Sequence, residues 1–366
     1  MSKSTRNEFL PDYVSPPGDT LLEILNEQGM TQVELAHRTG RPKKTINEII
    51  KGKAILTPET ALQLEYVLGI PAHFWNSREQ QYRETLARLD ERKRLNLQTE
   101  WLKGFPIKKM IQYGWILEKA DKVEQLEALL SFFGIASSEQ WENFWQTRVD
   151  IAFRKSESYK SNPRALIAWL RKGEIEGQKI ICAKYQREKF EKALRHIRKL
   201  TLSSPESFQP KMQKLCADAG VALVFVPQLP KTFASGATHW LSTDKALIQL
   251  SLRYKTDDHL WFSFFHEAGH ILLHRKKDFF VEFNGRQEKT DLEKEADAFA
   301  ANCLISKLQY DNFVKTHNLK ISKSAIQNFA NEIGIAPGVV VGMLQHDQYL
   351  PYSHCNGLKR RLEWTD

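Results

Sequence analysis

Two histidines and a glutamate lie within one five-residue stretch, His266-Glu267-Ala268-Gly269-His270, at a spacing that suits a metal site. Residues four apart share a face of a helix, so His266 and His270 can offer two imidazole nitrogens to one zinc ion. Glu267 points toward the same site and can act there as a base. Apolar residues flank the motif on both sides, which is typical of a helix buried against a core. The stretch indicates the first half of a metallopeptidase centre.

A second acidic motif follows further along the chain, where Glu293 and Asp297 are again four residues apart. On a helix, one of these acids can complete a zinc set of two histidines and one carboxylate, while the other holds a ligand imidazole from behind. Glu295 is the alternative ligand, but it lies about 200° around the helix from Glu293 and cannot share its site. We expect Glu293 to be the ligand, with Asp297 as the acceptor for an imidazole and Glu295 on a solvated face.

The ligand set predicts a mechanism. Zinc held by His266, His270 and Glu293 would keep a fourth position for water, lower the pKa of that water and polarise the scissile carbonyl. Glu267 would take the water proton and pass it to the leaving amine. A donor for the tetrahedral oxyanion is also expected, although spacing does not choose among the candidates and each has a structural alternative. These candidates are His239, Tyr254, His274 and His317.

Short apolar runs rich in β-formers precede the histidine motif. Residues 221–226, 237–241 and 246–252 are predicted strands, so a small sheet leads into the two zinc helices. An extended peptide can add to an exposed edge of such a sheet and reach the metal without a strict sequence code. Further helices are predicted over residues 322–333 and 337–345, where they could pack under the site or recognise a partner.

The segments HEAGHILLH and EKEADAFAANCLIS together resemble the ImmA/IrrE family of gluzincin metallopeptidases. The resemblance covers roughly residues 209–345. It implies a zinc site at His266, His270 and Glu293, and a protein substrate that is a helix-turn-helix repressor of stress or mobile-element genes. Residues 303–306, Cys-Leu-Ile-Ser, depart from the Leu-Leu-Met-Pro-like ending that is more frequent in the family. This departure concerns a helix end and leaves the ligands untouched.

The N-terminal part carries helix start and stop signals of its own. Thr31 and Glu34 are spaced as a capping box, and Gly40 can take the left-handed conformation that ends the helix. Pro42 suits the first turn of the next helix. Ile46 and its neighbours Ile49 and Ile50 would face the core of this second helix, leaving its polar face outward. The candidate DNA contacts are Gln32, Arg41, Lys43, Lys44 and Asn47.

Residues 17–75 resemble the Xre-type helix-turn-helix of the HigA/VapI antitoxin family, with residues 47–53, 57–61 and 71–75 as the matching motifs. The resemblance implies DNA as a partner. The near-neutral charge of residues 1–80 does not oppose this, because five bases lie in the stretch that would meet DNA. The alternative is an Xre fold that is retained for protein contact or dimerisation.

The middle of the chain is predicted to be helical and basic. Residues 81–210 carry 25 Lys and Arg against 17 Asp and Glu, so they hold most of the net charge of +9. Such a surface can approach nucleic acid or an acidic partner, and a solvated helical surface is the alternative. Spaced apolar residues predict helices over residues 83–96, 121–133, 138–153, 163–172 and 180–200.

Length and composition favour an intracellular enzyme of several domains. A chain of 366 residues with 42% hydrophobic content can form two or three sizeable cores. The four cysteines, at positions 182, 216, 303 and 355, are too widely spread for a disulfide framework or a cysteine-based zinc site. We find neither an apolar signal core at the N-terminus nor a run long enough to span a membrane. We expect a cytoplasmic protein.

These observations predict an α+β, mostly helical protein in three parts. They are a helix-turn-helix domain over residues 1–80, a basic helical domain over residues 81–208, and a gluzincin-like zinc peptidase domain with a small sheet over residues 209–366. The expected function is that of a DNA-binding regulator that cleaves a regulatory protein, with a homodimer among its expected states. The competing hypothesis is a HigA-like antitoxin and repressor, with a cognate toxin as partner, whose peptidase-like domain senses a ligand or partner without turnover.

Overall fold

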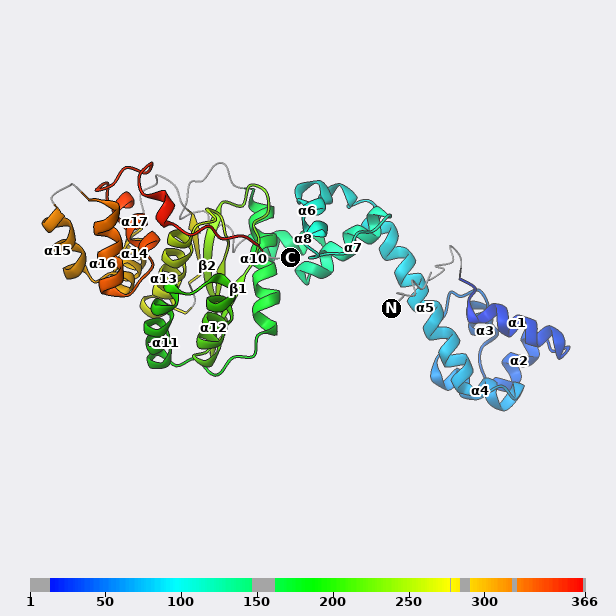
Figure 1. Ribbon diagram of the computed structural model, residues 1–366. Coiled ribbons are helices and arrows are strands. Elements are labelled where there is room, and N and C mark those ends of the chain that lie inside the picture. Colours follow the sequence, from blue (N-terminus) through cyan, green and yellow to red (C-terminus); the bar gives the residue numbers. More distant parts are fainter. Residues whose placement is uncertain (1–13, 147–161, 277, 284–289, 318–320, 365–366) are drawn as a thin grey trace. The chain divides into compact units, whose positions relative to one another are not determined.

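A computed structural model shows the expected α+β, mostly helical chain (Figure 1). Contacts within the chain divide it into two compact units, Met1–Glu100 and Trp101–Asp366. The predicted three-part division at residues 80 and 208 stays a prediction. None of the helices in the described part of the chain is both long and apolar enough to cross a membrane. The structure describes residues 14–146, 162–276, 278–283, 290–317 and 321–364.

The first unit is a bundle of helices around one apolar core. Its last helix, α5, is longer than the helix predicted over residues 83–96, because it starts directly after Pro71. Trp75 at the start of α5 is fully buried among the leucines and isoleucines of the other helices. The helices are α1 (Pro17–Glu27), α2 (Gln32–Thr39), α3 (Lys43–Ile50), α4 (Pro58–Leu68) and α5 (Ala72–Asn96).

The predicted helix-turn-helix signals are confirmed in α2 and α3. The Thr31 side chain accepts a hydrogen bond from the Glu34 backbone N–H, and Gly40 ends α2 in the left-handed conformation with φ 66°. Pro42 lies one residue before α3 rather than in its first turn. The three isoleucines of α3 are buried, as expected, so α3 is fixed against the core by one face.

The second unit begins with short helices that enclose an aromatic cluster. The predicted helix over residues 121–133 is confirmed, with Asp121 as its N-cap. The helix predicted over residues 138–153 is confirmed as far as the structure describes it, as an α-helix to Trp141 followed by a π-helical turn to Gln146. Residues 147–153 lie outside the described residues. The elements are α6 (Ile107–Gln112), α7 (Lys122–Phe133), α8 (Ser138–Trp141) and η2 (Glu142–Gln146).

Helix α10 (Pro163–Lys179) extends beyond the predicted end at residue 172. Gly173 lies inside this helix. The absence of a side chain there makes room for the Gln249 side chain of the sheet. Helix α11 (Arg187–Lys199) begins later than the predicted residue 180. The reason is tertiary: the backbone N–H of Tyr185 donates to Asp244 O, and residues 183–186 make further backbone hydrogen bonds to the segment before the first strand.

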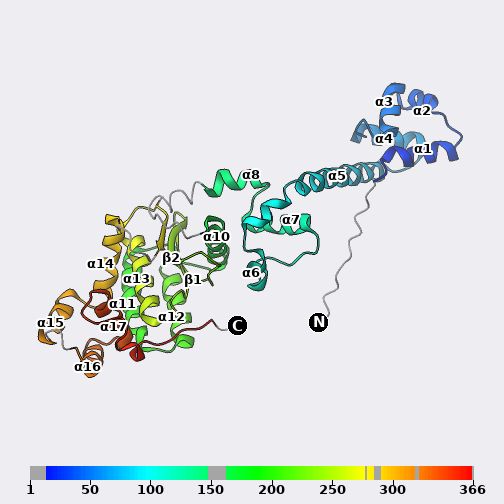
Figure 2. The ribbon, with the colours of Figure 1, turned by 90° about the horizontal axis from the view of Figure 1, so that it is seen from above.

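Four strands form a mixed sheet in the order β1-β3-β2-β4, with β1 parallel to β3 and the other pairs antiparallel. Helix α10 covers one face of the sheet and α13 covers the other (Figure 2). The three predicted strands are confirmed, whereas β4 was not predicted. The elements are α12 (Pro205–Asp218), β1 (Val221–Phe225), β2 (Ala234–Ser242), β3 (Lys245–Leu250) and β4 (Phe280–Phe283).

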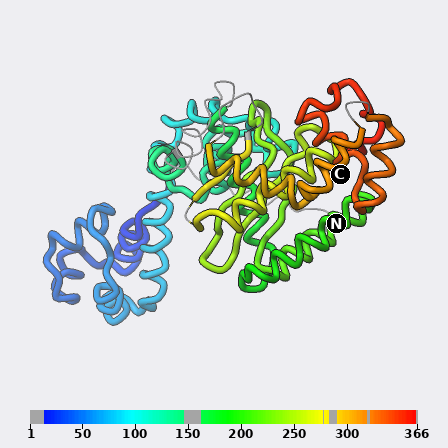
Figure 3. Tube along the Cα trace, turned by 90° about the vertical axis from the view of Figure 1, so that its left-hand side faces the viewer, coloured from blue at the N-terminus to red at the C-terminus, as the bar shows by residue number. Residues whose placement is uncertain are grey.

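Helices α14 and α17 pack against α13, which carries the histidine motif. Helix α14 lies beside α13 (Figure 3), and the two approach closely at Gly269, where an added Cβ would lie 3.3 Å from the Ala296 Cα. Helices α16 and α17 confirm two predictions, and α15 was not predicted. The elements are α13 (Asp257–Leu273), α14 (Asp291–Leu304), α15 (Lys307–His317), α16 (Lys323–Ile333) and α17 (Pro337–His346).

Candidate metal centre and helix-turn-helix surface

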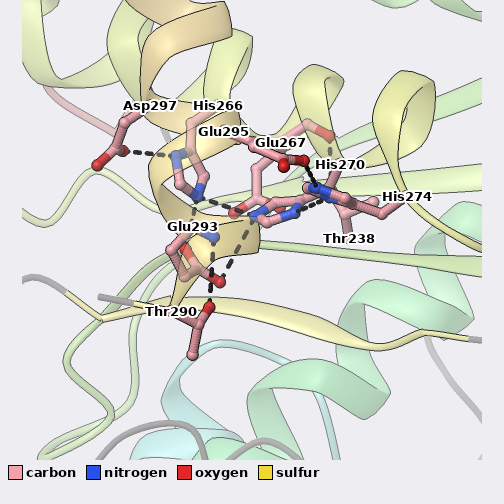
Figure 4. A network of polar contacts seen from close by, with 9 residues as sticks. All are labelled: Thr238, His266, Glu267, His270, His274, Thr290, Glu293, Glu295 and Asp297. Atoms are coloured by element: carbon pink, nitrogen blue, oxygen red, sulfur yellow. Dashed lines mark hydrogen bonds and ion pairs between the residues drawn. The ribbon is translucent and has the colours of Figure 1, made fainter. Parts of the chain in front are cut away.

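The side chains of His266, His270 and Glu293 converge between α13 and α14 (Figure 4). The two Nε2 atoms lie 3.0 Å apart, and the Glu293 carboxylate oxygens lie 3.1 Å from His266 Nε2 and 3.7 Å from His270 Nε2. Tetrahedral ligands at 2.0–2.1 Å from one zinc ion are about 3.3 Å apart. The three side chains are therefore spaced to bind a single zinc ion.

Local structure fixes each donor in this group. His266 and His270 are buried in the middle of α13, between the sheet and α14. Glu293 lies in the first turn of α14, where the Thr290 side chain accepts a hydrogen bond from the Glu293 backbone N–H and so starts the helix. The close helix contact at Gly269 brings this turn within reach of the histidines.

Asp297 holds His266 from behind. Its Oδ1 lies 2.9 Å from His266 Nδ1, one helical turn after Glu293 on α14. When Nδ1 donates its proton to this carboxylate, Nε2 carries the lone pair and faces the other two donors. The geometry is what the i, i+4 spacing of Glu293 and Asp297 predicts.

Glu295 lies apart from Glu293. Its side chain is exposed, as expected, but it also contacts a histidine. Its Oε2 lies 3.2 Å from His274 Nε2, and His274 Nδ1 lies 2.9 Å from His270 Nδ1. The sequence reasoning missed this connection. The spacing of His274, four residues after His270, was a signal that could have indicated it.

Glu267 is completely buried beside the metal-binding group. Neither of its carboxylate oxygens has a hydrogen-bond partner among the described residues. Gly236 of β2 leaves room for this carboxylate, since an added Cβ would overlap Glu267 Oε1, and Thr238 on the same strand donates a hydrogen bond to the Glu267 backbone oxygen at 3.3 Å. Sequence reasoning did not identify Gly236, because the contact depends on how β2 packs on α13.

Burial and mutual hydrogen bonds shift the pKa values of the groups in this site. Burial raises the pKa of Glu267 well above its ordinary value. Burial also lowers the pKa of His270 to about 4, so this imidazole is neutral and free to bind a metal. Burial opposes ionisation of His266 and Glu293. Hydrogen bonds with Asp297 and Glu293 outweigh it at His266, whose pKa is raised, and hydrogen bonds with His266 and His270 outweigh it at Glu293, whose pKa is lowered.

A cavity of about 300 Å³ adjoins the group, between α13, α14 and α17. Asp297 joins the cavity to the metal-binding group, because it lines the cavity and contacts His266. Apolar side chains form most of the remaining wall, so the cavity suits part of a peptide side chain. Its lining includes Phe262, Ala301, Leu304, Val339 and Met343.

Three of the four oxyanion candidates make contacts elsewhere. His239 lies on the α10 side of β2, 3.5 Å from Glu174, and its ring packs on Phe279. The rings of Tyr254 and His259 stack at 4.1 Å. His317 Nδ1 lies 2.9 Å from the Phe313 backbone oxygen within α15. Of the four candidates, His274 is the one in contact with a predicted zinc ligand.

The candidate DNA contacts lie around the exposed side of α3. Lys43 and Lys44 are exposed, and Lys44 Nζ lies 3.8 Å from Glu48 in a solvated pair that is worth little energetically. Asn47 Nδ2 donates to Gln32 Oε1 at 3.4 Å, so the start of α2 and the middle of α3 present one pair of amides.

Arg41 is held differently from the other candidates. Its Nε donates to Gln63 Oε1 of α4 at 2.7 Å, and the side chain is half-buried. The residue therefore joins the turn between α2 and α3 to α4 in this structure. Its assignment as a DNA contact stays a prediction, as do those of Gln32, Lys43, Lys44 and Asn47.

Comparison with known families identifies two different domains in the chain. Residues 21–75 match the helix-turn-helix family model, and residues 221–344 match the model of the IrrE N-terminal-like domain, a metallopeptidase family. The chain therefore carries an Xre-type helix-turn-helix domain at its N-terminus and an IrrE-like peptidase-family domain at its C-terminus. This confirms the two resemblances that the sequence motifs indicated.

A curated relative matches a short stretch of the chain. The chain is 36% identical over 59 residues to the uncharacterized HTH-type transcriptional regulator YddM of Escherichia coli (strain K12). The match covers 16% of this chain and 63% of that regulator. That regulator is titled as helix-turn-helix-type, and residues 21–75 of this chain match the helix-turn-helix family model.

Proposed function

We propose that this protein is a DNA-binding regulator whose IrrE-like domain is a zinc-dependent endopeptidase. One observation carries the proposal: the carboxylate of Glu267 is fully buried, has no hydrogen-bond partner among the described residues, and lies beside His266, His270 and Glu293. A buried carboxyl group without a partner is costly to a fold and is typical of a site that a ligand completes.

The residues present fit zinc in the manner of a hydrolytic site. Two imidazoles and one carboxylate are the ligand set of several zinc peptidases, and three protein ligands leave one coordination position open. Bound zinc would polarise a carbonyl oxygen and stabilise the charge that develops on it. His266, His270 and Glu293 would hold the ion.

Glu267 would hold and move the proton in peptide cleavage. Glu267 lies buried beside the three proposed ligands, so its carboxylate is the proton acceptor that can reach a substrate held there. Its carboxylate would take a proton from the attacking water and deliver it to the amine that leaves. Gly236 and the backbone of α13 hold the side chain in place, so little reorganisation is needed.

The cavity beside Asp297 would position the peptide. Its apolar walls, which include Phe262, Leu304 and Met343, would take the side chain of a residue next to the scissile bond and exclude water from it. The carboxyl groups that also line this cavity, Asp258, Glu282, Asp297 and Asp347, disfavour an acidic side chain. We infer that the substrate has an apolar residue at this position.

The helix-turn-helix domain supports a regulatory substrate. A chain that binds DNA through α3 and cleaves peptides through α13 can act where a repressor is bound, so a helix-turn-helix repressor in a stress, mobile-element or defence response is the proposed target. The amide pair of Asn47 and Gln32 and the exposed Lys43 and Lys44 would supply the base and phosphate contacts.

Proteome-wide sequencing of protein N-termini tests the peptidase proposal. Cells that express the full chain are compared with cells that express Glu267→Gln, which keeps the shape and the zinc ligands but loses the proton acceptor. We expect new N-termini in a DNA-binding repressor with the wild-type protein alone. Identical N-termini in both strains, with zinc bound to both proteins, would overturn the peptidase proposal and support an antitoxin-like repressor that senses a partner without turnover.

A further inference from the structure

We propose that His274 and Glu295 form a second positioning chain, which fixes the ring of His270 as Asp297 fixes the ring of His266. The inference rests on the proposed zinc site and names how one of its ligands is held. His270 Nδ1 lies 2.9 Å from His274 Nδ1, and His274 Nε2 lies 3.2 Å from Glu295 Oε2 (Figure 4). Three side chains from α13 and α14 are thus joined in a line behind the metal-binding group.

The ring of His274 is held rigidly in this line. His274 follows the last residue of α13, and its backbone N–H donates to the His270 backbone oxygen at 3.2 Å. Its side chain is 2% exposed. The Phe280 ring of β4 stacks on His270 with 3.9 Å between the centroids and lies 5.2 Å from the ring of His274. Packing therefore restricts rotation of both imidazoles.

Hydrogen-bond chemistry determines which atom donates and which accepts in the chain from His270 through His274 to Glu295. An Nδ1 to Nδ1 contact needs one N–H and one lone pair. His270 Nε2 faces Glu293 and His266, so it must carry a lone pair when it binds a metal, and the proton of His270 is then on Nδ1. His274 accepts that proton's hydrogen bond at Nδ1 and donates from Nε2 to Glu295. One carboxylate thereby sets the tautomers of two imidazoles.

This assignment leaves His274 no role in stabilising an oxyanion. Both of its ring nitrogens are engaged, one with His270 and the other with Glu295, so neither is available to donate to a substrate. His274 is a positioning residue that acts through His270. The two ligand imidazoles therefore differ: Asp297 contacts His266 directly, whereas Glu295 reaches His270 through a second ring.

The expected effects follow from burial. Loss of a group that orients a ligand imidazole weakens metal binding about tenfold to a hundredfold. We expect a weakening of this size from His274→Ala, because the ring is buried. Glu295→Ala should have a smaller effect, since its side chain is 59% exposed and water screens its charge. Glutamine at position 274 can accept from His270 and donate to Glu295, so His274→Gln should restore most of the affinity.

Zinc affinity of the full chain, measured by competition with a chromophoric chelator, tests the proposal. Asp291→Ala is the matched control, because Asp291 is an acid of the same helix whose side chain is 92% exposed and pairs with Lys294. We expect it to bind zinc as the wild type does. Circular dichroism of each variant reports whether the fold is kept, and Glu295→Ala provides a surface change that leaves the core intact.

The outcomes separate this proposal from the zinc site itself. Absence of zinc binding by the wild-type protein would overturn the proposed function. Wild-type affinity in folded His274→Ala or in Glu295→Ala would overturn the positioning chain alone. The chain would also be overturned if His274→Gln bound zinc as weakly as His274→Ala while Glu295→Ala kept the wild-type affinity. That result would show that His274 acts only by packing.

Discussion

The backbone of Gly236 in β2 lies directly against the carboxylate of Glu267 in α13, so that a Cβ at position 236 would overlap Oε1 and lie 2.8 Å from Cγ of that glutamate. Because Gly236 has no side chain, the sheet leaves space for the Glu267 carboxylate. The position of β2 therefore limits where the side chain of Glu267, the proposed base, can lie.

Gly236→Ala should displace the Glu267 side chain while leaving the zinc ligands in place. Since the proton acceptor would no longer meet the scissile bond, we expect cleavage to fall by about a hundredfold or more, with zinc content unchanged. Gly357→Ala is the control, because a Cβ there would meet open space. Cleavage of the repressor found by N-terminal sequencing provides the measurement. Unaltered turnover in Gly236→Ala would show that Glu267 is misassigned or that its position is not critical.

His266→Ala and His270→Ala should each lose zinc, since each removes one of three donors that converge within 4.8 Å. The wild-type protein should bind about one zinc ion per chain. His317→Ala is the control, because this histidine contacts the Phe313 backbone of its own helix. Metal analysis after dialysis measures the outcome, and full zinc occupancy in both ligand variants would remove the proposed centre.

Much of the site follows from helical spacing. The pairs His266 with His270, and Glu293 with Asp297, are each four residues apart, and that spacing alone predicts which side chains share a face. The match of residues 221–344 to the IrrE N-terminal-like domain is in keeping with these motifs. The assignment of the residues as ligands and positioning group stays a proposal that the geometry supports.

The parts that the sequence did not predict depend on tertiary contacts. Residues 183–186 have a helical pattern, but they are not helical, because the backbone N–H groups of residues 183, 185 and 186 donate hydrogen bonds to other segments. The four residues of β4 form a strand through pairing with β2, and the Phe and Val residues of the run 279–283 were a local signal that could have indicated it. Glu295 reaches His274 because α14 packs closely on α13, which periodicity within one helix does not reveal.

The stability of the second unit should fall as pH rises through the range in which Asp257 ionises. Burial is the main cause that raises the pKa of this carboxyl group from its ordinary value of 3.8 to about 6. The folded state therefore keeps the proton that the unfolded state releases, and stability is highest below the unfolded pKa and declines until the pH exceeds 6. A shift of about two pKa units corresponds to about 3 kcal/mol.

Asp257→Asn should remove this dependence, because the amide oxygen can still accept from the backbone N–H groups of Asp258 and Arg360. Urea unfolding followed by tryptophan fluorescence measures the difference between variant and wild type. We expect the variant to gain about 2 kcal/mol relative to wild type between pH 4.5 and 7.5. A constant difference over this range would contradict the assignment of the raised pKa to Asp257.

Filling the cavity should block the proposed peptide position without affecting the metal. Ala301 lines the cavity and is only partly buried, so Ala301→Trp can be accommodated while it occupies much of the space. We expect a hydroxamate derived from phenylalanine to bind the zinc-loaded variant at least about tenfold more weakly than wild type. Acetohydroxamate, which lacks the side chain, is the control and should bind both proteins equally. Equal binding of both probes to both proteins would place the peptide side chain elsewhere.

The exposed face of α3 should read DNA through two kinds of contact. Lys43→Ala and Lys44→Ala should weaken operator binding and flatten its salt dependence, because each removes a phosphate contact and the release of a counterion. Lys93→Ala on α5 is the control for loss of one exposed charge. Anisotropy titrations against the promoter of the protein's own gene, at several salt concentrations, give the slopes, and equal slopes for all variants would exclude these lysines from the interface.

Asn47 and Gln32 should instead determine base preference. Because Asn47 Nδ2 donates to Gln32 Oε1, each amide holds the other in position, so Asn47→Ala and Gln32→Ala should relax the preference at the same base pair. We expect a cost of about 1–3 kcal/mol at that pair for Asn47→Ala, with folding and zinc content unchanged. The same titrations with altered operators measure it. If wild-type protein shows no sequence preference, the N-terminal domain is better explained as a protein-interaction module, and the basic residues of the middle segment become the candidate for nucleic-acid contact.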